Sequence, residues 1–345
     1  MRAFDYSFLK SITIDTDLLS IAMGIERLRE RDANRIASFP RTYSGMRSAA
    51  MMQSVFGSNA IEGIFTGDDR LREICMRKVE PAGRSESEIA GYRDALDAVH
   101  NGNMGLSTDM IRGLHRIMLS HTGEEGGRWK DRDNFIGRRR ADGTMEIHFK
   151  PMSWGNVLDA MESLVSAYKA ARQDSSVNRL LLIPCFVLDF LSIHPFLDGN
   201  GRVSRLLSLH LLYTEGYDVG RYVSLESMIY RNRPDYYRSL AESSVGWADG
   251  TNDYMPFIRN FLDTLFLCYK ELDRRFVTSV GSKDNKGARV EYAVLNALSP
   301  ISRRELHELL PDISDPMISK VLARLVDEGR ISKLGSGPST RYYRK

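Results

Sequence analysis

The chain has 345 residues, of which 42% are hydrophobic and 27% charged, and its formal net charge is +3 at pH 7. These values indicate a globular protein with room for two or three domains and for a sizeable core. The 3 cysteines are odd in number and widely spaced, which argues against a disulfide framework and favours a reducing compartment. No apolar run approaches the roughly 20 residues that span a bilayer, and the N-terminal residues lack the apolar core of a signal peptide. We therefore expect a cytoplasmic protein without membrane contact.

The first informative segment is a predicted helix that ends near Gly63. Residues 48–56 have a sequence suited to a helix, and a glycine commonly follows a helix end. Ser58 and Glu62 lie close to that end. Taken alone, Glu62 is most simply interpreted as a solvated residue at the end of a helix.

A β-hairpin is predicted further along the chain. The segments 134–140 and 144–149 flank Asp142-Gly143, which is a strong signal for a hairpin turn. An exposed strand edge can pair with an extended peptide through main-chain hydrogen bonds. Without further information, this would be an ordinary surface hairpin.

Two buried helices are predicted in the middle of the chain. The run from Leu180 to Leu191 is almost wholly apolar, and leucines recur from Leu206 to Leu212. Between them lies the sequence His194-Pro-Phe-Leu-Asp-Gly-Asn-Gly-Arg-Val-Ser-Arg205. This polar cluster therefore occupies a sharp connection between two core helices, where its backbone is held rigidly.

The glycines in this connection predict an anion-binding turn. Gly199 and Gly201 on either side of Asn200 allow several N–H groups to point the same way. A helix that begins near Gly201 adds the positive end of its dipole. Arg202 and Arg205 lie three residues apart on one face of that helix, where both can bind neighbouring phosphates.

Two further side chains supply the remaining chemistry. Asp198 offers a hard carboxylate oxygen suited to Mg²⁺, which usually keeps several waters and bridges substrate phosphates. His194 can accept a proton near neutral pH, which would turn a hydroxyl group into a nucleophile. A zinc site built on these two residues is conceivable, but no further His/Cys pair at ligand spacing supports it. The residue types together predict transfer of a phosphate-bearing group.

The aromatic pair Tyr236 and Tyr237 follows in the next predicted helix. Both rings could belong to the core or the rim of that helix, and either could pack on a nucleobase. Adjacent positions on a helix point in different directions, so the two tyrosines need not share one role.

The C-terminal part of the chain has its own pattern of elements. A helix over Phe257–Phe276 is followed by a polar break at Ser282–Gly287 that is typical of a linker. A helical stripe of apolar residues then runs from Val290 to Leu298. Ser302 to Glu305 form a capping box that opens a short second helix through Leu310.

A third helix and a hairpin complete this segment. Asp315-Pro316 predicts a helix start with a cap and a proline at the first helical position, and Gly329 predicts its end. Two short strands, residues 331–334 and 340–344, are joined by a Gly-Ser-Gly-Pro turn. Three helices and a hairpin resemble a winged helix-turn-helix domain.

The charge of this segment bears on its partners. Residues 285–345 hold 11 Lys/Arg against 7 Asp/Glu, a net charge of +4, so the basic excess of the chain is concentrated there. DNA binding is one interpretation, and protein contact or dimerisation through the same domain is the other. The side chains expected to contact DNA are Ser319, Lys320, Arg324, Lys333 and Arg341.

The central motif resembles a known family signature. Residues His194 to Arg205 match the Fic signature His-Pro-Phe-x-Asp/Glu-Gly-Asn-Gly-Arg-x-x-Arg without departure. The resemblance implies a protein AMP transferase, which moves AMP from ATP to a Ser, Thr or Tyr hydroxyl of a target protein. It also implies that His194 is the base and Asp198 the Mg²⁺ ligand. Relatives that phosphorylate can carry a lysine at the position of Gly199, so this chain looks like the nucleotidyl-transfer type.

The resemblance assigns the phosphates as well. Gly199, Asn200 and Gly201 would form the anion hole at the α-phosphate. Arg202 would hold the β-phosphate region, and Arg205 the γ-phosphate. In related proteins the segment after Arg231 forms part of the nucleoside pocket, which makes Tyr236 and Tyr237 candidates for packing on adenine. The hairpin resembles the flap with which Fic proteins align a target segment.

The segment around Ser58 is similar to the family's inhibitory motif, Ser/Thr-x-x-x-Glu-Gly/Asn, with Glu62 and Gly63 at its last two positions. A glutamate that reached into the cradle would pair with Arg205 and displace ATP from a productive pose. In some relatives the equivalent glutamate positions a water that removes AMP from the target. Net AMP removal therefore remains an alternative function.

We thus expect a mainly α protein, a Fic-fold helical bundle with a β-hairpin flap and a small C-terminal winged helix. The expected domains are an N-terminal helical region over 1–105, a catalytic core over 106–278, a linker over 279–288 and the winged helix over 289–345. A second alternative is a DNA-binding regulator in which nucleotide occupancy of the Fic core only signals.

Overall fold

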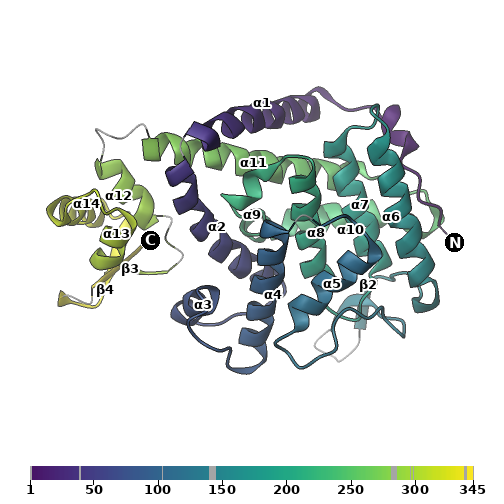
Figure 1. Ribbon diagram of the computed structural model, residues 1–345, viewed down its shortest axis with the longest axis horizontal. Coiled ribbons are helices and arrows are strands. Elements are labelled where there is room, and N and C mark those ends of the chain that lie inside the picture. Colours follow the sequence, from purple (N-terminus) through teal and green to yellow (C-terminus); the bar gives the residue numbers. More distant parts are fainter. Residues whose placement is uncertain are drawn as a thin grey trace. The chain divides into compact units, whose positions relative to one another are not determined.

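The computed structural model describes the chain except for residues 1, 39, 103, 140–144, 281–285, 296, 298, 338–339 and 345. The described part is mainly helical, as predicted (Figure 1). The chain divides into two compact units, Met1–Ala37 with Met46–Tyr269, and Ser38–Gly45 with Lys270–Lys345. None of the described helices combines the length and apolarity needed to cross a bilayer.

The helices of the larger unit follow one another along the chain, and three of them have residues in both units. They are α1 (Thr16–Ser38), α2 (Pro40–Ile61), α3 (Asp68–Cys75), α4 (Gly83–Asn101), α5 (Thr108–Leu119), α6 (Val157–Gln173), α7 (Arg179–Ile193), α8 (Asn200–Thr214), α9 (Leu225–Arg231), α10 (Arg233–Ser244) and α11 (Met255–Val280), with short 3₁₀ turns at Ser7–Lys10, Trp154–Asn156, Asp218–Arg221 and Trp247–Asp249.

Helix α7 forms the centre of the larger unit. Asn178 caps its first turn by accepting a hydrogen bond from the N–H of Leu180 at 2.8 Å, and every residue from Leu180 to Ile193 is buried. Helices α6 and α8 pack on α7, and α8 also contacts α4 and α5 (Figure 1). The predicted pair of apolar core helices is therefore confirmed, and the connection between them is fixed at both ends.

A buried carboxylate in α7 anchors the N-terminal segment. Asp189 accepts hydrogen bonds from the hydroxyl of Tyr6 at 2.8 Å, the indole N–H of Trp247 at 2.7 Å and the hydroxyl of Tyr254 at 2.9 Å. Burial raises the pKa of Asp189 above its usual value. Because these donors satisfy the carboxylate, the segment before α1 is tied to the core about one turn before α7 ends.

The predicted hairpin is present beside these helices. Strands β1 (Ile136–Arg139) and β2 (Met145–Phe149) are antiparallel, with a register shift between Ile136 and Gly137. The turn predicted at Asp142-Gly143 lies outside the described residues. The hairpin follows Asn134, a residue that contacts the connection between α7 and α8.

The smaller unit contains the three helices and the hairpin predicted for the C-terminal segment. They are α12 (Lys286–Leu295), α13 (Arg303–Leu309) and α14 (Asp315–Asp327), with strands β4 (Ile331–Leu334) and β5 (Arg341–Arg344). A two-residue strand that the sequence did not indicate, β3 (Ile301–Ser302), pairs with β5, so the sheet order is β3-β5-β4.

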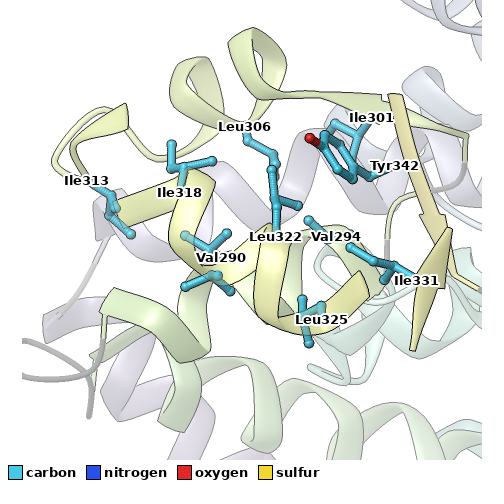
Figure 2. Close-up of a cluster of buried hydrophobic side chains, with 11 residues drawn as sticks. Val290, Val294, Ile301, Leu306, Ile313, Ile318, Leu322, Leu325, Ile331 and Tyr342 are labelled. Atoms are coloured by element: carbon cyan, nitrogen blue, oxygen red, sulfur yellow. The ribbon is translucent and has the colours of Figure 1, made fainter. Parts of the chain in front are cut away.

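One hydrophobic cluster holds this unit together, and apolar side chains from all three helices and the sheet meet in it (Figure 2). Its fully buried members include Val290, Leu306, Ile318 and Leu325. The helical spacing of these residues is what the sequence showed, and their contact confirms that the stripes face one another.

Two details of the C-terminal prediction can be compared with the structure. The capping box between Ser302 and Glu305 is confirmed. The predicted cap of α14 was one residue off, because Ser314 occupies the N-cap and Asp315 is already helical. The centre of the predicted linker, residues 281–285, lies outside the described residues.

Candidate active site

The connection between α7 and α8 is held in a specific backbone conformation. His194 ends α7 in the left-handed region (φ 52°), and Gly199 precedes α8 with φ 79°. The Asn200 side chain closes the loop, since its Oδ1 accepts from Phe196 N at 2.9 Å and its Nδ2 donates to Phe196 O at 2.8 Å. The amide of Asn200 thus maintains the loop, and the main-chain N–H of this residue remains available to an anion.

The anion cradle predicted at the start of α8 has the expected backbone geometry. The first hydrogen bond of the helix joins Val203 N to Gly199 O at 2.9 Å. The N–H groups of Asn200, Gly201 and Arg202 precede that bond, as the first N–H groups of any helix do. They and the helix dipole favour a negative group at this point.

The loop rests on His115 of α5, which the sequence analysis did not single out. Its ring stacks on Phe196 with centroids 3.8 Å apart. The Nδ1 atom accepts from Gly127 N at 2.8 Å, so Nε2 carries the proton and donates to Asp198 O at 3.2 Å. Burial lowers the pKa of His115 to about 4, which keeps the ring neutral at pH 7.

Lys130 supports the same loop from another side and was also missed. Its N–H donates to Pro195 O at 2.8 Å, and its Nζ donates to Asn134 Oδ1 at 2.9 Å and Ile193 O at 3.3 Å. Asn134 in turn donates to Phe196 O at 3.2 Å. Burial lowers the pKa of Lys130 to about 8. The contacts of Lys130 and Asn134 with the connection join residues about 60 positions apart, so no local signal in the sequence reveals them.

The His194 imidazole is prepared to accept a proton. Its Nδ1 lies 3.2 Å from Leu191 O, and because a carbonyl can only accept, Nδ1 carries the hydrogen. The lone pair is therefore on Nε2. The pKa of His194 is lowered to about 4. Desolvation is the largest cause, and the positive charge of the neighbouring Lys130 acts in the same direction. His194 is neutral at pH 7, as a general base must be.

Asp198 has the environment expected of a magnesium ligand. Its side chain is 62% exposed, Oδ1 accepts from Gly199 N at 2.6 Å, and Oδ2 lies 3.6 Å from Arg202 Nη2. Within the described ranges, no group of three or more His, Cys, Asp or Glu gathers into a metal cluster. A single accessible carboxylate fits Mg²⁺, which completes its shell with water and substrate phosphates.

Arg202 and Arg205, the two arginines predicted to bind phosphates, have different partners in the structure. Arg202 Nη1 donates to the buried Glu88 of α4 at 2.7 Å, and its buried Nε has no hydrogen-bond partner among the described residues. Glu88 is also bonded to Arg84 at 2.9 Å. Arg205 instead points toward the end of α2. The two guanidinium groups are thus held by different carboxylates.

The end of α2 lies against Arg205. Arg205 Nε donates to Ser58 Oγ at 2.8 Å, and Nη2 donates to Ser58 O at 3.0 Å and Glu62 Oε1 at 2.7 Å. Gly63, with φ 77°, ends the helix as predicted. Glu62 Oε1 also packs against Gly201 so closely that a Cβ at Gly201 would overlap it. A carboxylate therefore lies at the helix N-terminus where an anionic ligand is expected.

The two tyrosines of α10 have different environments. Tyr236 is buried and packs on Phe257, with ring centroids 6.0 Å apart. Tyr237 is 42% exposed, and its ring centroid lies 5.5 Å from that of Tyr236. Burial raises the pKa of both hydroxyls, and both lie near enough to Arg205 to be influenced by its charge. Tyr237 is the ring of this pair that a ligand can reach.

The residues predicted to contact DNA are divided by their ion pairs. Arg324 lies 2.5 Å from Glu291 and 3.7 Å from Glu328. Arg341 donates to a main-chain carbonyl and lies 3.7 Å from Glu305. The side chains of the remaining three are exposed or half-buried, namely Ser319, Lys320 and Lys333. Two of the five predicted contacts are thus partly neutralised by acidic neighbours.

Comparison with known proteins agrees with this geometry. Residues 105–212, which include α7, α8 and the connection between them, match the Fic/DOC family model. The match is confined to this central stretch, which is similar to a Fic/DOC domain. Proteins named "Protein adenylyltransferase Fic" from Nematostella vectensis and Aedes aegypti are 25% and 28% identical over 237 and 255 residues. These matches cover 66% and 69% of this chain but only 50% and 45% of the relatives, so the chain spans about half their length.

Solved structures show that the fold extends beyond the matched Fic domain. A Fic family protein from Desulfovibrio desulfuricans G20 superposes with a TM-score of 0.61 at 20% identity, and the match covers 97% of both chains. A Fic domain containing signaling protein from Bacteroides thetaiotaomicron gives a TM-score of 0.58, also at 20% identity, over 73% of this chain and 97% of its own. The expected Fic fold is thereby confirmed.

Proposed function

We propose that this protein is an AMP transferase that moves AMP from ATP to a Ser, Thr or Tyr hydroxyl of a target protein, and that Glu62 represses it. The names of the relatives and the complete signature support the reaction class. The observation that carries the proposal is the site around Gly201. A helix N-terminus, a neutral histidine base and a buried arginine converge there, and a glutamate lies against them.

Each residue has a defined part in the proposed reaction. The first N–H groups of α8 and the guanidinium groups of Arg202 and Arg205 bind the phosphates. His194 Nε2 takes the proton of the target hydroxyl while its oxygen bonds to the α-phosphorus, and the bond from that phosphorus to the pyrophosphate breaks. Mg²⁺ held by Asp198 would neutralise phosphate charge. Catalysis rests on positioning and charge stabilisation.

Repression follows from competition for one cation. Glu62 Oε1 takes the Arg205 Nη2 donor at 2.7 Å and covers Gly201. A triphosphate that used Arg205 would place a negative charge close to this carboxylate. The Glu62 side chain is 33% exposed and follows Ile61, the last residue of α2, so it can move aside without disturbing the helix core.

The test is labelling of protein by radioactive ATP with Mg²⁺. Glu62→Gly should label protein more strongly than the unmodified chain, and adding His194→Ala should remove the label. Equal labelling with and without His194 would overturn the assignment of the base. Intact-mass analysis of Glu62→Gly after exposure to each nucleoside triphosphate then identifies the donor and the transferred group.

Two other functions predict different results. A net AMP-removing hydrolase would lose AMP release from a modified protein when Glu62 is replaced by glycine. A DNA-binding regulator would keep its cellular effect in His194→Ala and lose it in Lys320→Glu. The ion pairs that engage Arg324 and Arg341 make the regulator the weaker alternative.

A further inference from the structure

A buried carboxylate, Glu226, lies among the residues that surround the partners of Arg205, and the reaction proposed above does not use it. Glu226, in the first turn of α9, is 0% exposed. It accepts hydrogen bonds from Ser54 Oγ at 2.7 Å, Tyr92 Oη at 3.0 Å and Ser224 Oγ at 3.2 Å. Three hydroxyl groups from α2, α4 and the cap of α9 therefore converge on one side chain.

This cluster continues to Arg205. The Tyr92 hydroxyl lies beside Ser58, whose Oγ accepts from Arg205 Nε at 2.8 Å. Ser58 and Tyr92 are fully buried, and Arg205 is 2% exposed. The chain of contacts thus runs from Arg205 through Ser58 and Tyr92 to Glu226, and water is excluded along it.

The direction of each hydrogen bond in this relay is fixed by its two ends. A guanidinium group can only donate and a carboxylate can only accept. Arg205 donates to Ser58, and Tyr92 donates its one hydrogen to Glu226, so the Tyr92 oxygen can only accept from Ser58. Every hydroxyl points from the cation toward the anion, an arrangement in which neighbouring dipoles strengthen one another in a low-dielectric interior.

The relay is built on rigid elements. At Gly57 in α2, a Cβ would lie 2.7 Å from Ser227 N and 2.8 Å from Glu226 C, so only glycine allows α2 to approach α9 this closely. Ser227 Oγ also donates to Gln53 O at 2.8 Å. Ser58 and Glu226 are consequently held in register by the helices that carry them.

We propose that Glu226 is a positioning residue which, through Tyr92 and Ser58, holds the Arg205 guanidinium in place for a triphosphate whether or not Glu62 is bound. This inference rests on the proposed function and adds a second, permanent partner for Arg205. Glu62 is the exposed acceptor that a phosphate replaces. Glu226 is the buried acceptor that stays, so the Arg205 guanidinium needs to move little when Glu62 is displaced.

The test measures ATP and AMP affinity by titration calorimetry with Mg²⁺ in the Glu62→Gly protein. Tyr92→Phe and Glu226→Gln, each added to it, should lower ATP affinity about tenfold, the effect of losing roughly 1.4 kcal/mol from a contact to a charged group. AMP affinity should not change, because AMP lacks the γ-phosphate assigned to Arg205. A general loss of structure would weaken both ligands.

The matched control is Tyr168→Phe, also in the Glu62→Gly protein. Tyr168 is 1% exposed, and its hydroxyl has no hydrogen-bond partner among the described residues, so the same atom is removed without touching the relay. An ATP-to-AMP affinity ratio in Tyr92→Phe equal to that in Tyr168→Phe would overturn the inference. If Glu226→Gln does not fold, Tyr92→Phe decides alone, since it keeps the ring.

Failure of the proposed function would be visible before these variants are compared. Glu62→Gly itself would then bind neither nucleotide, which overturns the function and the inference together. ATP binding by Glu62→Gly with an unchanged ratio in Tyr92→Phe leaves the function standing and rejects only the relay.

Discussion

At the scale of single residues, the state of His194 follows from burial rather than from its place in a motif. The sequence shows only that an imidazole is present, with an ordinary pKa of about 6.5. In the folded chain the ring is partly withdrawn from water and lies near Lys130, which together lower its pKa to about 4. A base with this pKa stays unprotonated across the neutral range.

This state predicts the pH dependence of labelling. In Glu62→Gly the initial rate should be level from pH 8 to about pH 5.5 and then fall as His194 becomes protonated, with a midpoint near 4. The rate measured over this range in overlapping buffers checks the prediction. Recovery of the rate on return to pH 7 serves as the control for unfolding. A midpoint near 6.5 would show that the imidazole is solvated.

Gly201 lies beside both Glu62 and the expected phosphate position, and one substitution would affect both. A methyl group there would overlap Glu62 Oε1 and would also stand at the N-terminus of α8, where a phosphate is expected. Gly201→Ala should therefore break the Glu62–Arg205 contact without increasing labelling. The comparison is with Glu62→Gly, which breaks the same contact and leaves the cradle open. Labelling by Gly201→Ala that matches Glu62→Gly would show that the phosphate lies elsewhere.

At the scale of elements, apolar periodicity was sufficient to place α7 and α8, because runs as apolar as Leu180–Leu191 have few alternatives to a buried helix. The turn between them was also predictable, because its glycines mark a chain reversal. The partners of its side chains were not. Glu88 and Arg202 lie 114 positions apart, and His115 and Asp198 lie 83 apart.

The support of this turn by α5 depends on a close approach of two helices. At Gly91 in α4, a Cβ would collide with the main-chain carbonyl of Met118 in α5, where the backbone cannot yield as a side-chain end can. The same α5 carries His115, which stacks under the loop. Separation of α4 and α5 would therefore displace His115 and disturb the active-site loop.

Gly91→Ala should lower the free energy of unfolding by about 3 kcal/mol or more, since a clash with backbone forces two packed helices apart. Labelling in the Glu62→Gly background should fall with it. Gly113→Ala in α5 is the matched control, because nothing lies within 4 Å of its added Cβ. That variant should be neutral or up to about 1 kcal/mol more stable. Urea unfolding measures the free energy of unfolding of both variants. Equal changes in the two would contradict the close contact between α4 and α5.

At the scale of the molecule, the sequence predicted the elements of the smaller unit better than their pairing. The capping box at Ser302 is a local pattern and was found, whereas β3 is two residues long and exists only through its pairing with β5 some 40 positions later. The larger unit shows the same limit. The Asp189 cluster joins residues 2–6, α7 and the segment around Trp247, and no local signal connects them.

Burial of histidines also sets how stability depends on pH. His100, His115 and His194 all have lowered pKa values, of about 3, 4 and 4, and burial is the largest cause for each. The unfolded chain binds a proton at these residues near pH 6.5, and the folded chain does not until about pH 4. Between those values the unfolded state holds more protons, so stability falls as pH is lowered.

Each such histidine should contribute a slope of about 1.4 kcal/mol per pH unit between roughly pH 4.5 and 6. His100 offers the cleanest test, because it lies outside the active site and faces Tyr213, Arg221 and Arg47. His100→Gln keeps a polar group toward the Tyr213 hydroxyl and removes the titration. The free energy of unfolding of both proteins is measured in urea at pH 6, 5 and 4.5. Its slope against pH should be smaller in His100→Gln by about 1.4 kcal/mol per pH unit, which corresponds to one proton. Parallel slopes would mean that His100 is already charged in the folded protein, which burial beside two arginines opposes.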